Sequence, residues 1–174
     1  MEEALNRSIL EKLKGRDFLT LKDFSAEELK TILSLALKLE SSWRQTQLLK
    51  GKTVVMIFQK PSTRTRVSFE VAVKQLGGWT VSLGWSEMQL GRGETIADTA
   101  RTLERYADAI VARVFSHSHL EELAENSGIP VINALSDLYH PCQALSDMLT
   151  IWKKFRRFRD VKLAWVGDGN NVCN

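Results

Sequence analysis

The sequence lacks any apolar run long enough to cross a bilayer, and it lacks the N-terminal features of an exported protein. Its longest apolar runs, such as residues 54–58 and 109–112, are short, whereas a membrane-spanning helix needs about 20 apolar residues. The N-terminal segment is acidic and then amphipathic, which fits neither a secretory signal nor an arginine-rich transit peptide. We therefore expect a cytoplasmic protein with no membrane partner.

Cysteine is scarce. Cys142 and Cys173 show neither the spacing of a disulfide framework nor that of a metal site, so a reducing compartment suits them. His117 and His119 lie in a polar turn, where we expect loop residues rather than metal ligands. The Gly-x-Gly turn at residues 167–169 does not complete a dinucleotide-binding pattern. We predict no metal and no other cofactor.

The composition is that of an ordinary globular protein. Hydrophobic residues make up 44% and charged residues 26%, and no low-complexity tract is present, so we expect a packed core. The net charge of +3 is compatible with an anionic substrate. We interpret the basic run at residues 153–159 as a solvated helix end rather than a nucleic-acid patch, and we expect no nucleic-acid partner.

Hydrophobic periodicity predicts alternating strands and helices. Ser25 and Glu28 form a capping box ahead of a helix that reaches Leu39, and residues 53–59 predict a strand buried on both faces, central and parallel. The alternation continues with helices near residues 67–76, 96–106, 120–126 and 141–155 and strands at 79–83, 109–114, 131–134 and 161–166. This order predicts an α/β fold, with a parallel sheet flanked by helices on both faces.

The last predicted strand bears on the domain organisation. Residues 161–166 lead into a glycine-containing turn, and such a turn normally feeds a helix. We therefore expect residues 1–153 to form one domain that includes an interdomain helix. Residues 154–174 would be the linker and first strand of an incomplete second α/β domain. The alternative is that this strand joins the first sheet.

Residues 58–66 lie where a buried strand turns into a helix, at the carboxyl edge of the predicted sheet, and ligands bind at that edge. Free N–H groups and the helix dipole favour an anion there. The hydroxyls of Ser62 and Thr63 and the guanidinium of Arg64 would surround a phosphate. The alternative is an ordinary helix N-cap made by Ser62 or Thr63, with solvated arginines.

The segment Ser62-Thr63-Arg64-Thr65-Arg66, followed by Ser-Phe-Glu at 68–70, resembles the carbamoyl phosphate signature of the aspartate and ornithine carbamoyltransferase family. Further segments similar to this family follow in the family's order, at residues 89–91, 93–99, 108–113, 140–143 and 167–171. The resemblance extends from about residue 15 to residue 171. Several motifs in order are more specific than any one of them.

The resemblance implies direct attack of an amine on the carbonyl carbon of carbamoyl phosphate, with release of phosphate and no covalent enzyme intermediate. Thr65, Arg113 and His140 would act on the carbonyl oxygen, where donors fixed beforehand stabilise developing charge. The side chains implied to bind carbamoyl phosphate are Ser62, Thr63, Arg64, Thr65, Gln89, Arg113, His140 and Gln143.

Each of these assignments has a simpler structural alternative. Arg113 ends a predicted strand, where a structural salt bridge would also explain it. His140 precedes a proline at a helix start, where a histidine is often structural; the helix N-terminus would lower its pKa and keep a neutral donor. Gln143 could be an ordinary helix-surface residue. We expect Cys142 to be a small buried side chain rather than a nucleophile.

Gln89 resembles the residue that reaches into the active site of a neighbouring subunit. This implies a homotrimer, or an assembly of trimers, with shared active sites. The alternative is that the polar, glycine-containing segment 84–94 is simply a mobile loop.

Two features favour L-ornithine over aspartate as the acceptor. Arg92 stands where aspartate enzymes typically carry a lysine, and Asn170-Asn171 stands where they carry a Lys-Tyr-Gly-Arg-like turn. Asn171 resembles the residue that contacts the α-amino and carboxylate end of the acceptor. Because the family's second half is missing, we expect little or no turnover by this chain alone. Another transcarbamylase, including an aspartate carbamoyltransferase, and a non-catalytic anion-binding fragment are the alternatives.

Overall fold

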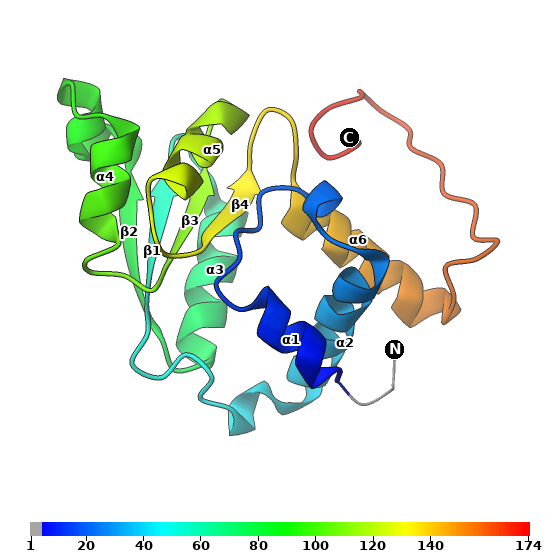
Figure 1. Ribbon diagram of the computed structural model, residues 1–174. Coiled ribbons are helices and arrows are strands. Elements are labelled where there is room, and N and C mark those ends of the chain that lie inside the picture. The colour runs from blue at the N-terminus through cyan, green and yellow to red at the C-terminus, as the bar shows by residue number, and fades with distance from the viewer. Residues whose placement is uncertain (1–4) are drawn as a thin grey trace.

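The computed structural model of the protein describes residues 5–174, apart from the side chains at positions 45, 91 and 92. Its centre is a four-stranded sheet in the order β2-β1-β3-β4 (Figure 1). The strands are β1 (Thr53–Phe58), β2 (Trp79–Gly84), β3 (Ala109–Arg113) and β4 (Val131–Leu135). All neighbouring pairs are parallel, and β1 pairs with both β2 and β3. The predicted parallel sheet and the central position of its first strand are confirmed.

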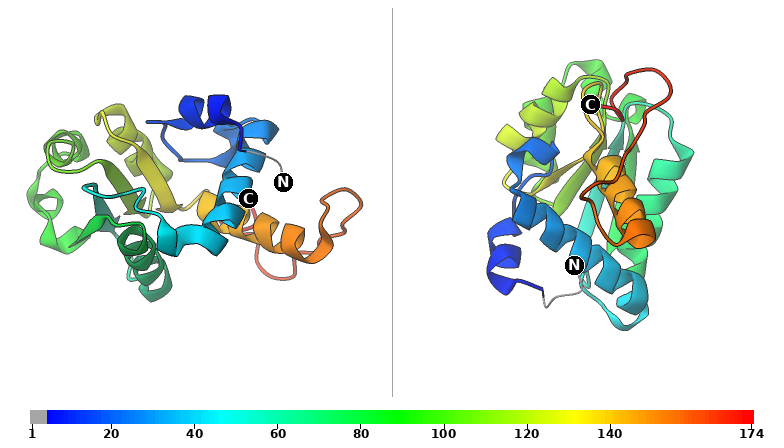
Figure 2. Two further views of the ribbon diagram at one scale, coloured as in Figure 1. Left: turned by 90° about the horizontal axis from the view of Figure 1, so that it is seen from below. Right: turned by 90° about the vertical axis from the view of Figure 1, so that its right-hand side faces the viewer.

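Helices cover both faces of this sheet, as predicted (Figure 2). They are α1 (Arg7–Leu13), α2 (Ala26–Ser42), α3 (Thr63–Gln75), α4 (Ile96–Leu103), α5 (His117–Glu125) and α6 (Pro141–Phe155). Short 3-10 turns lie at Leu21–Asp23, Trp43–Gln45, Trp85–Glu87 and Gln89–Arg92. No helix in the described part of the chain has the length and apolar character needed to span a membrane.

The alternating side chains of β1 belong to two different cores. Val55 and Ile57 pack in the cluster that includes residues of α4 and α5, whereas Val54 and Met56 pack in the cluster that includes Val73 of α3. Successive side chains of a strand point to opposite faces, so a strand covered on both sides is apolar throughout. This explains why β1 reads as an uninterrupted apolar run in the sequence.

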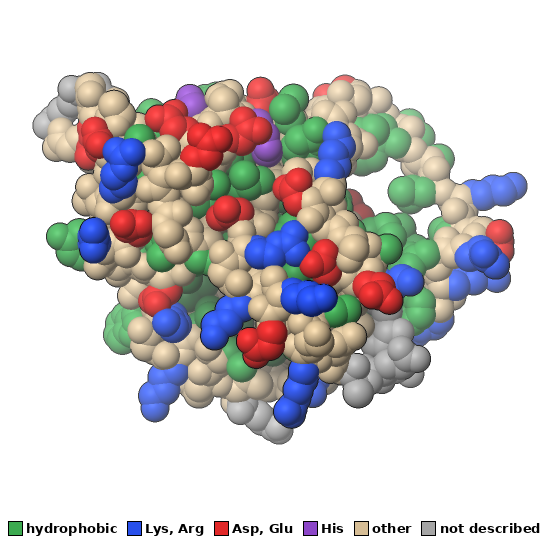
Figure 3. Space-filling view, in the orientation of Figure 1, with side chains coloured by type: hydrophobic (Ala, Val, Ile, Leu, Met, Phe, Trp, Pro, Cys, Tyr) green, Lys and Arg blue, Asp and Glu red, His purple; other side chains and the backbone are tan. Residues whose placement is uncertain are grey.

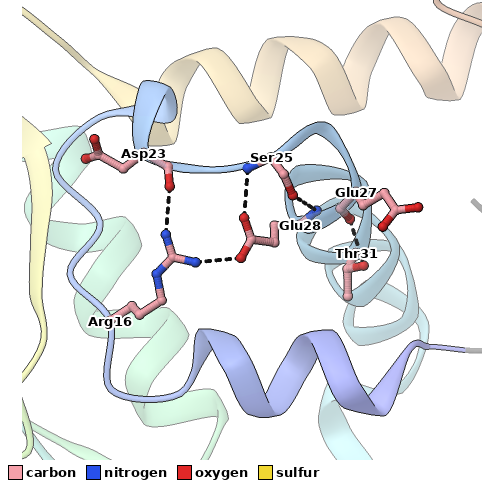
Figure 4. Close-up of polar contacts among 6 residues, drawn as sticks. All are labelled: Arg16, Asp23, Ser25, Glu27, Glu28 and Thr31. Atoms are coloured by element: carbon pink, nitrogen blue, oxygen red, sulfur yellow. Dashed lines mark hydrogen bonds and ion pairs between the residues drawn. The ribbon is translucent and has the colours of Figure 1, made fainter.

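The N-terminal part is tied to α2 through Arg16 (Figure 4). Its guanidinium pairs with Glu28 at 2.5 Å and donates to the carbonyl of Asp23 at 2.7 Å. Glu28 also completes the predicted capping box with Ser25, because each side chain accepts from the other residue's backbone N–H. The capping box therefore starts α2 and also anchors the segment that precedes it.

The segment after α1 lies along the outer edge of β4. Phe18 forms a parallel bridge with Ile132: its N–H donates to the Val131 carbonyl at 2.8 Å, and its carbonyl accepts from the Asn133 N–H at 2.9 Å. The side chain of Asp17 also accepts from the N–H of Val131. An open sheet edge presents unpaired backbone groups, and this segment satisfies those of β4.

Some element boundaries differ from the predictions. α3 starts at Thr63 rather than near residue 67, and α4 ends at Leu103, after which tighter turns lead into β3. The expectation that His117 and His119 are loop residues is wrong, because both lie in the first turn of α5. The Asp137 carboxylate accepts from the N–H of His117 at 2.7 Å and so satisfies a helix start that lacks a local capping side chain.

The predicted strand at residues 161–166 is not formed in the structure. Its apolar side chains are largely exposed, with Leu163 at 75% and Val166 at 95% of their full accessibility. A strand requires a neighbour for its ladder hydrogen bonds, and the sheet within residues 5–174 pairs only β1 to β4. The last residues return instead to the loop after β4, where Asn174 donates to the Leu138 carbonyl at 3.0 Å.

The basic run lies at the end of α6 and beyond it, in exposed positions. Lys153 pairs with Glu40 of α2 at 2.6 Å, which joins these two helices, neighbours in both views (Figures 1 and 2). On the face drawn in Figure 3, acidic and basic side chains are interspersed. The run therefore matches a solvated helix end.

Candidate functional site

A pocket of about 580 Å³ opens at the carboxyl edge of the sheet. The turn between β1 and α3, the end of β3 and the start of α6 contribute its walls. The predicted site residues that line it are Ser62, Thr63, Arg64, Thr65, Arg113, His140 and Gln143. The structure thus gathers side chains that are up to 81 positions apart in the sequence, since Ser62 and Gln143 (143 − 62 = 81) share one pocket.

The start of α3 provides the anion-binding wall. Ser62 occupies the N-cap position in extended backbone geometry, but its hydroxyl caps no N–H group of the helix. The ordinary N-cap made by Ser62 is therefore not what the structure shows. The first N–H groups of a helix have no intrahelical acceptor, and the helix dipole is positive there. Together with the hydroxyls of Thr63 and Thr65, this end of α3 offers several donors to an anion.

Arg113 is a cation that pairs with no carboxylate among the described residues. Its Nη1 donates to Thr65 Oγ1 at 3.2 Å, while its Nε is buried without a hydrogen-bond acceptor among residues 5–174. The ion pairs found in that part of the chain do not include Arg113. Burial lowers the pKa of this guanidinium, and the nearby charge of Arg64 lowers it further. The structural salt bridge considered as an alternative is absent from the described residues.

His140 lies immediately before α6 and is half-buried, with its Nδ1 unpartnered in the described structure. Burial lowers the pKa of His140 below its ordinary value of 6.5, the charge of Arg113 lowers it further, and Asp147 opposes the shift. The predicted direction is therefore confirmed. The causes are burial and a neighbouring cation, which the local sequence does not reveal. The ring is neutral at neutral pH and can donate one N–H.

Two neighbours in α6 have different roles. Gln143 donates from Nε2 to Asp147 Oδ1 at 2.9 Å, which leaves its side-chain oxygen as an acceptor. Cys142 is held by a contact from Sγ to the Asn133 carbonyl at 3.5 Å, and burial raises the pKa of this thiol to about 12. Cys142 is partly buried and lines the pocket, but a thiol with this pKa is no nucleophile at neutral pH, which agrees with a structural rather than a nucleophilic residue.

Two predicted residues lie outside the pocket. Gln89 is exposed in the 3-10 turn Gln89–Arg92 and does not line the pocket of its own chain. Asn171 donates from its side-chain amide to the carbonyl of Ser136 in the loop that precedes His140. The structure therefore places Asn171 beside the segment that carries His140, but not in the pocket.

Two hydroxyl residues of the pocket wall, Ser68 and Ser146, are not among the predicted binding residues, although Ser68 belongs to the signature at residues 68–70. Each lies one turn after a predicted element of the site, and each donates to a carbonyl of its own helix: Ser68 to Thr65 at 2.9 Å and Ser146 to Cys142 at 2.9 Å. Helical spacing from the motif residues would have indicated both. No group of three or more His, Cys, Asp or Glu side chains within residues 5–174 is arranged to hold a metal ion.

Residues 16–153 match the family described as aspartate/ornithine carbamoyltransferase, carbamoyl-P binding domain. The chain belongs to this family. It is 57% identical over 166 residues to the anabolic ornithine carbamoyltransferase of Pyrococcus furiosus, an alignment that covers 93% of this chain and 52% of that protein.

Solved structures agree with the sequence comparison. The ornithine carbamoyltransferase from Pyrococcus furiosus superposes with a TM-score of 0.89 at 56% identity, over 92% of this chain and 52% of that one. Aspartate transcarbamoylase from Trypanosoma cruzi, in complex with N-(phosphonacetyl)-L-aspartic acid, gives a TM-score of 0.77 at 32% identity, over 84% and 47% of the two chains. This chain spans about half the length of the relatives it matches.

Proposed function

We propose that this chain binds carbamoyl phosphate and forms that half of an ornithine carbamoyltransferase site. The whole reaction transfers the carbamoyl group to the side-chain amine of L-ornithine and gives L-citrulline and phosphate. The observation that carries this proposal is that two arginines, Arg64 and Arg113, line the same pocket. No carboxylate in the described residues forms an ion pair with Arg113. A half-buried cation that has no carboxylate partner in the described residues is suited to an anionic ligand.

The phosphate group fits the start of α3. The free N–H groups there, the hydroxyls of Ser62, Thr63 and Thr65, and the guanidinium of Arg64 supply donors for a dianion, without any group that must first be deprotonated. These donors stand on a helix rather than on a long loop. Their positions are therefore fixed before the ligand arrives, which favours tight binding.

The carbonyl oxygen would face Thr65, Arg113 and His140. Because the Oγ1 of Thr65 already accepts from Arg113, its own hydrogen is free to point to the ligand. Attack by a neutral amine forms the N–C bond and breaks the bond from the carbonyl carbon to the phosphate oxygen. The departing phosphate takes the electron pair of the broken bond, and a phosphate oxygen accepts the proton that the amine loses. Negative charge grows on the carbonyl oxygen during the attack, where these donors stabilise it.

The amide group of carbamoyl phosphate would lie against Gln143. Its side-chain oxygen is left as an acceptor, because its nitrogen is engaged with Asp147. An amide N–H of the substrate could donate to that oxygen and so fix which face of the carbonyl meets the amine. Gln143 therefore contributes to orientation rather than to charge stabilisation.

We propose L-ornithine as the acceptor, because relatives of high sequence identity are named ornithine carbamoyltransferases and because Asn171 resembles the residue that contacts the acceptor. The anabolic relative supports a biosynthetic role.

We further propose a homotrimer, or an assembly of trimers, in which Gln89 enters a neighbour's site. Its exposed position, outside the pocket of its own chain, supports this role.

Residues 1–153 would be the carbamoyl phosphate domain and 154–174 the linker to a second domain. A cytoplasmic location suits the two free cysteines.

Calorimetric titration with carbamoyl phosphate tests the binding proposal. Saturable binding is expected for the unmodified chain and should be lost in Arg64→Ala. Arg105→Ala is the matched control, because this exposed arginine lies after α4 and does not line the pocket. A folded unmodified chain that binds no carbamoyl phosphate would contradict the proposal.

The acceptor is tested with bisubstrate analogues that join a phosphonacetyl group to an amino acid. N-(phosphonacetyl)-L-ornithine should bind more tightly than the L-aspartate analogue. Asn171→Ala should reduce this preference without weakening carbamoyl phosphate itself. Tighter binding of the aspartate analogue would identify the alternative acceptor.

A further inference from the structure

We propose that His117 is a positioning residue, which acts through Ser136 to fix the loop that places His140 in the pocket. This role rests on the function proposed above. His117 begins α5, and Ser136 begins the loop at residues 136–140 between β4 and α6. Both are buried, with exposed fractions of 6% for His117 and 0% for Ser136. Neither lines the pocket, so any influence on the ligand is indirect.

The contacts of the Ser136 hydroxyl determine whether it donates to His117 or accepts from it. The Ser136 Oγ lies 3.1 Å from the N–H nitrogen of Tyr139 and 3.3 Å from that of Leu138, and both can only donate to it. A hydroxyl has two lone pairs and one hydrogen. The two amides occupy the lone pairs, and the hydrogen is left for His117 Nδ1 at 2.9 Å, a shorter contact than the 3.4 Å to the Tyr139 carbonyl.

We infer from this arrangement that His117 Nδ1 accepts the hydroxyl hydrogen of Ser136. By accepting the hydroxyl hydrogen, the ring turns the lone pairs of Ser136 toward the backbone of the loop. Without this acceptor, the hydroxyl could rotate to the Tyr139 carbonyl and lose its alignment with the two amides. A leucine in place of His117 would fill similar space but could not hold the hydroxyl.

His117 also holds two other residues of the same loop. Its backbone N–H donates to the Asp137 carboxylate at 2.7 Å, and its ring packs edge-on against that of Tyr139, with centroids 5.2 Å apart at 85°. The loop is further attached to the segment that follows β3, because the Asp137 N–H donates to the Phe115 carbonyl at 3.0 Å. One buried residue thus contacts three loop positions in front of His140.

His140 depends on this loop for its direction. Its Nδ1 has no acceptor or donor in the described structure, so no side-chain contact at that atom fixes the ring. Its backbone is fixed on one side by α6, where its carbonyl accepts from Gln143 and Ala144. On the other side it follows Tyr139 directly. With no partner at Nδ1, the placement of the ring depends on the backbone on both sides of His140, and the loop held by His117 fixes one of these sides.

The test combines ligand affinity with the NMR signal of one ring. The chain has three histidines, so the His140 ring resonance can be assigned by substitution. His117→Leu and Ser136→Ala should shift that resonance, speed hydrogen exchange at the amides of Leu138 and Tyr139, and weaken carbamoyl phosphate binding about tenfold. His117→Asn should stay close to the unmodified chain, because an asparagine oxygen can accept where Nδ1 does.

Leu120→Val is the matched stability control, because Leu120 is fully buried in the same helix but touches the core rather than the loop. It should lower the melting temperature and leave the His140 resonance and the affinity unchanged. An equal loss of affinity in Leu120→Val would show that His117 is merely structural. An unchanged His140 signal in His117→Leu, or a His117→Asn chain as impaired as His117→Leu, would also overturn the positioning role.

The two proposals fail in different ways. If the unmodified chain binds no carbamoyl phosphate, the proposed function fails. The His140 resonance and the exchange rates of the Leu138 and Tyr139 amides still decide whether His117 holds the loop. If the unmodified chain binds but the His117 and Ser136 variants bind equally well, only the positioning role fails.

Discussion

Arg113 Nη1 donates to Thr65 Oγ1 across 3.2 Å, and this hydrogen bond joins the end of β3 to the first turn of α3. It brings a strand-end cation to the N-terminus of a helix, two features that each favour an anion. Because the Thr65 oxygen accepts from the cation, its hydrogen is directed elsewhere. The pair therefore orients a hydroxyl donor toward the pocket while keeping the guanidinium in place.

Thr65→Val removes this hydroxyl with little change in shape. Carbamoyl phosphate binding should weaken about tenfold, since one hydrogen bond to a charged group contributes about 1.5–3 kcal/mol and part of it is regained from water. Thr65→Ser keeps the hydroxyl and should bind within about twofold of the unmodified chain. Calorimetry on both variants checks this. Equal binding by Thr65→Val and the unmodified chain would remove Thr65 from the ligand contacts.

Arg113→Met should separate stability from binding. The half-buried guanidinium has no carboxylate partner in the described residues, and replacing an uncompensated cation by an apolar chain of similar volume is often stabilising. Without ligand, the variant should melt at a higher temperature than the unmodified chain. It should no longer bind carbamoyl phosphate. Thermal unfolding with and without ligand measures both effects. A lower melting temperature without ligand would indicate that Arg113 holds the fold together.

The lowered pKa of His140 predicts a pH dependence of stability. In the folded chain the ring takes up a proton at lower pH than its ordinary pKa of 6.5. Between pH 6.5 and the lower pKa of the folded chain, His140 binds more protons in the unfolded chain than in the folded chain. The free energy of unfolding therefore falls as the pH falls through this window. Urea unfolding at about pH 7.5 and about pH 5.5 measures this change in the free energy of unfolding.

His140→Gln, which does not titrate, is the control for this measurement. It should lose less free energy of unfolding than the unmodified chain over the same pH interval. Identical losses in both chains would show that His140 titrates at its ordinary pKa, and its neutral-donor role would lose its support.

The two cysteines should react differently with iodoacetamide. Burial raises the pKa of the Cys142 thiol to about 12, whereas Cys173 is exposed. At mildly alkaline pH, mass spectrometry should show alkylation of Cys173 and protection of Cys142 until the chain is unfolded. Cys142→Ala should retain carbamoyl phosphate binding, because the thiol takes no part in the proposed chemistry. Rapid alkylation of Cys142 in the folded chain would contradict the raised pKa of its thiol.

The elements of this fold that carry their own signals could be predicted from the sequence. Three local patterns are such signals: the capping box at Ser25 and Glu28, the apolar run of β1, and Pro141 at the start of α6. Each predicted an element that the structure contains at that position. The sequence also predicted that the residues after β1, at the end of β3 and at the start of α6 meet in one pocket, because parallel strands end at the same edge of the sheet; Gln89 and Asn171 lie outside it.

Other features depend on distant contacts and could not be predicted in this way. The strand expected at residues 161–166 has the right composition, but it finds no partner in the described part of the chain. The pKa of His140 is set mainly by burial and by Arg113, which is remote in the sequence. The polar residues around His117 predict a loop, and the contacts that place it at a helix start come from Ser136 and Asp137, which approach only when β4 lies beside β3.

The bridge between Phe18 and Ile132 has a consequence for how the chain folds during synthesis. The segment that closes the edge of β4 is made first, but its partner strand is made more than a hundred residues later, since Asp17 and Val131 are 114 positions apart. Until then, the N-terminal segment has no strand to join. Contacts of such long range are slow to form and expose a chain to aggregation, so the edge of the sheet at β4 cannot be closed by this segment before β4 itself has been made.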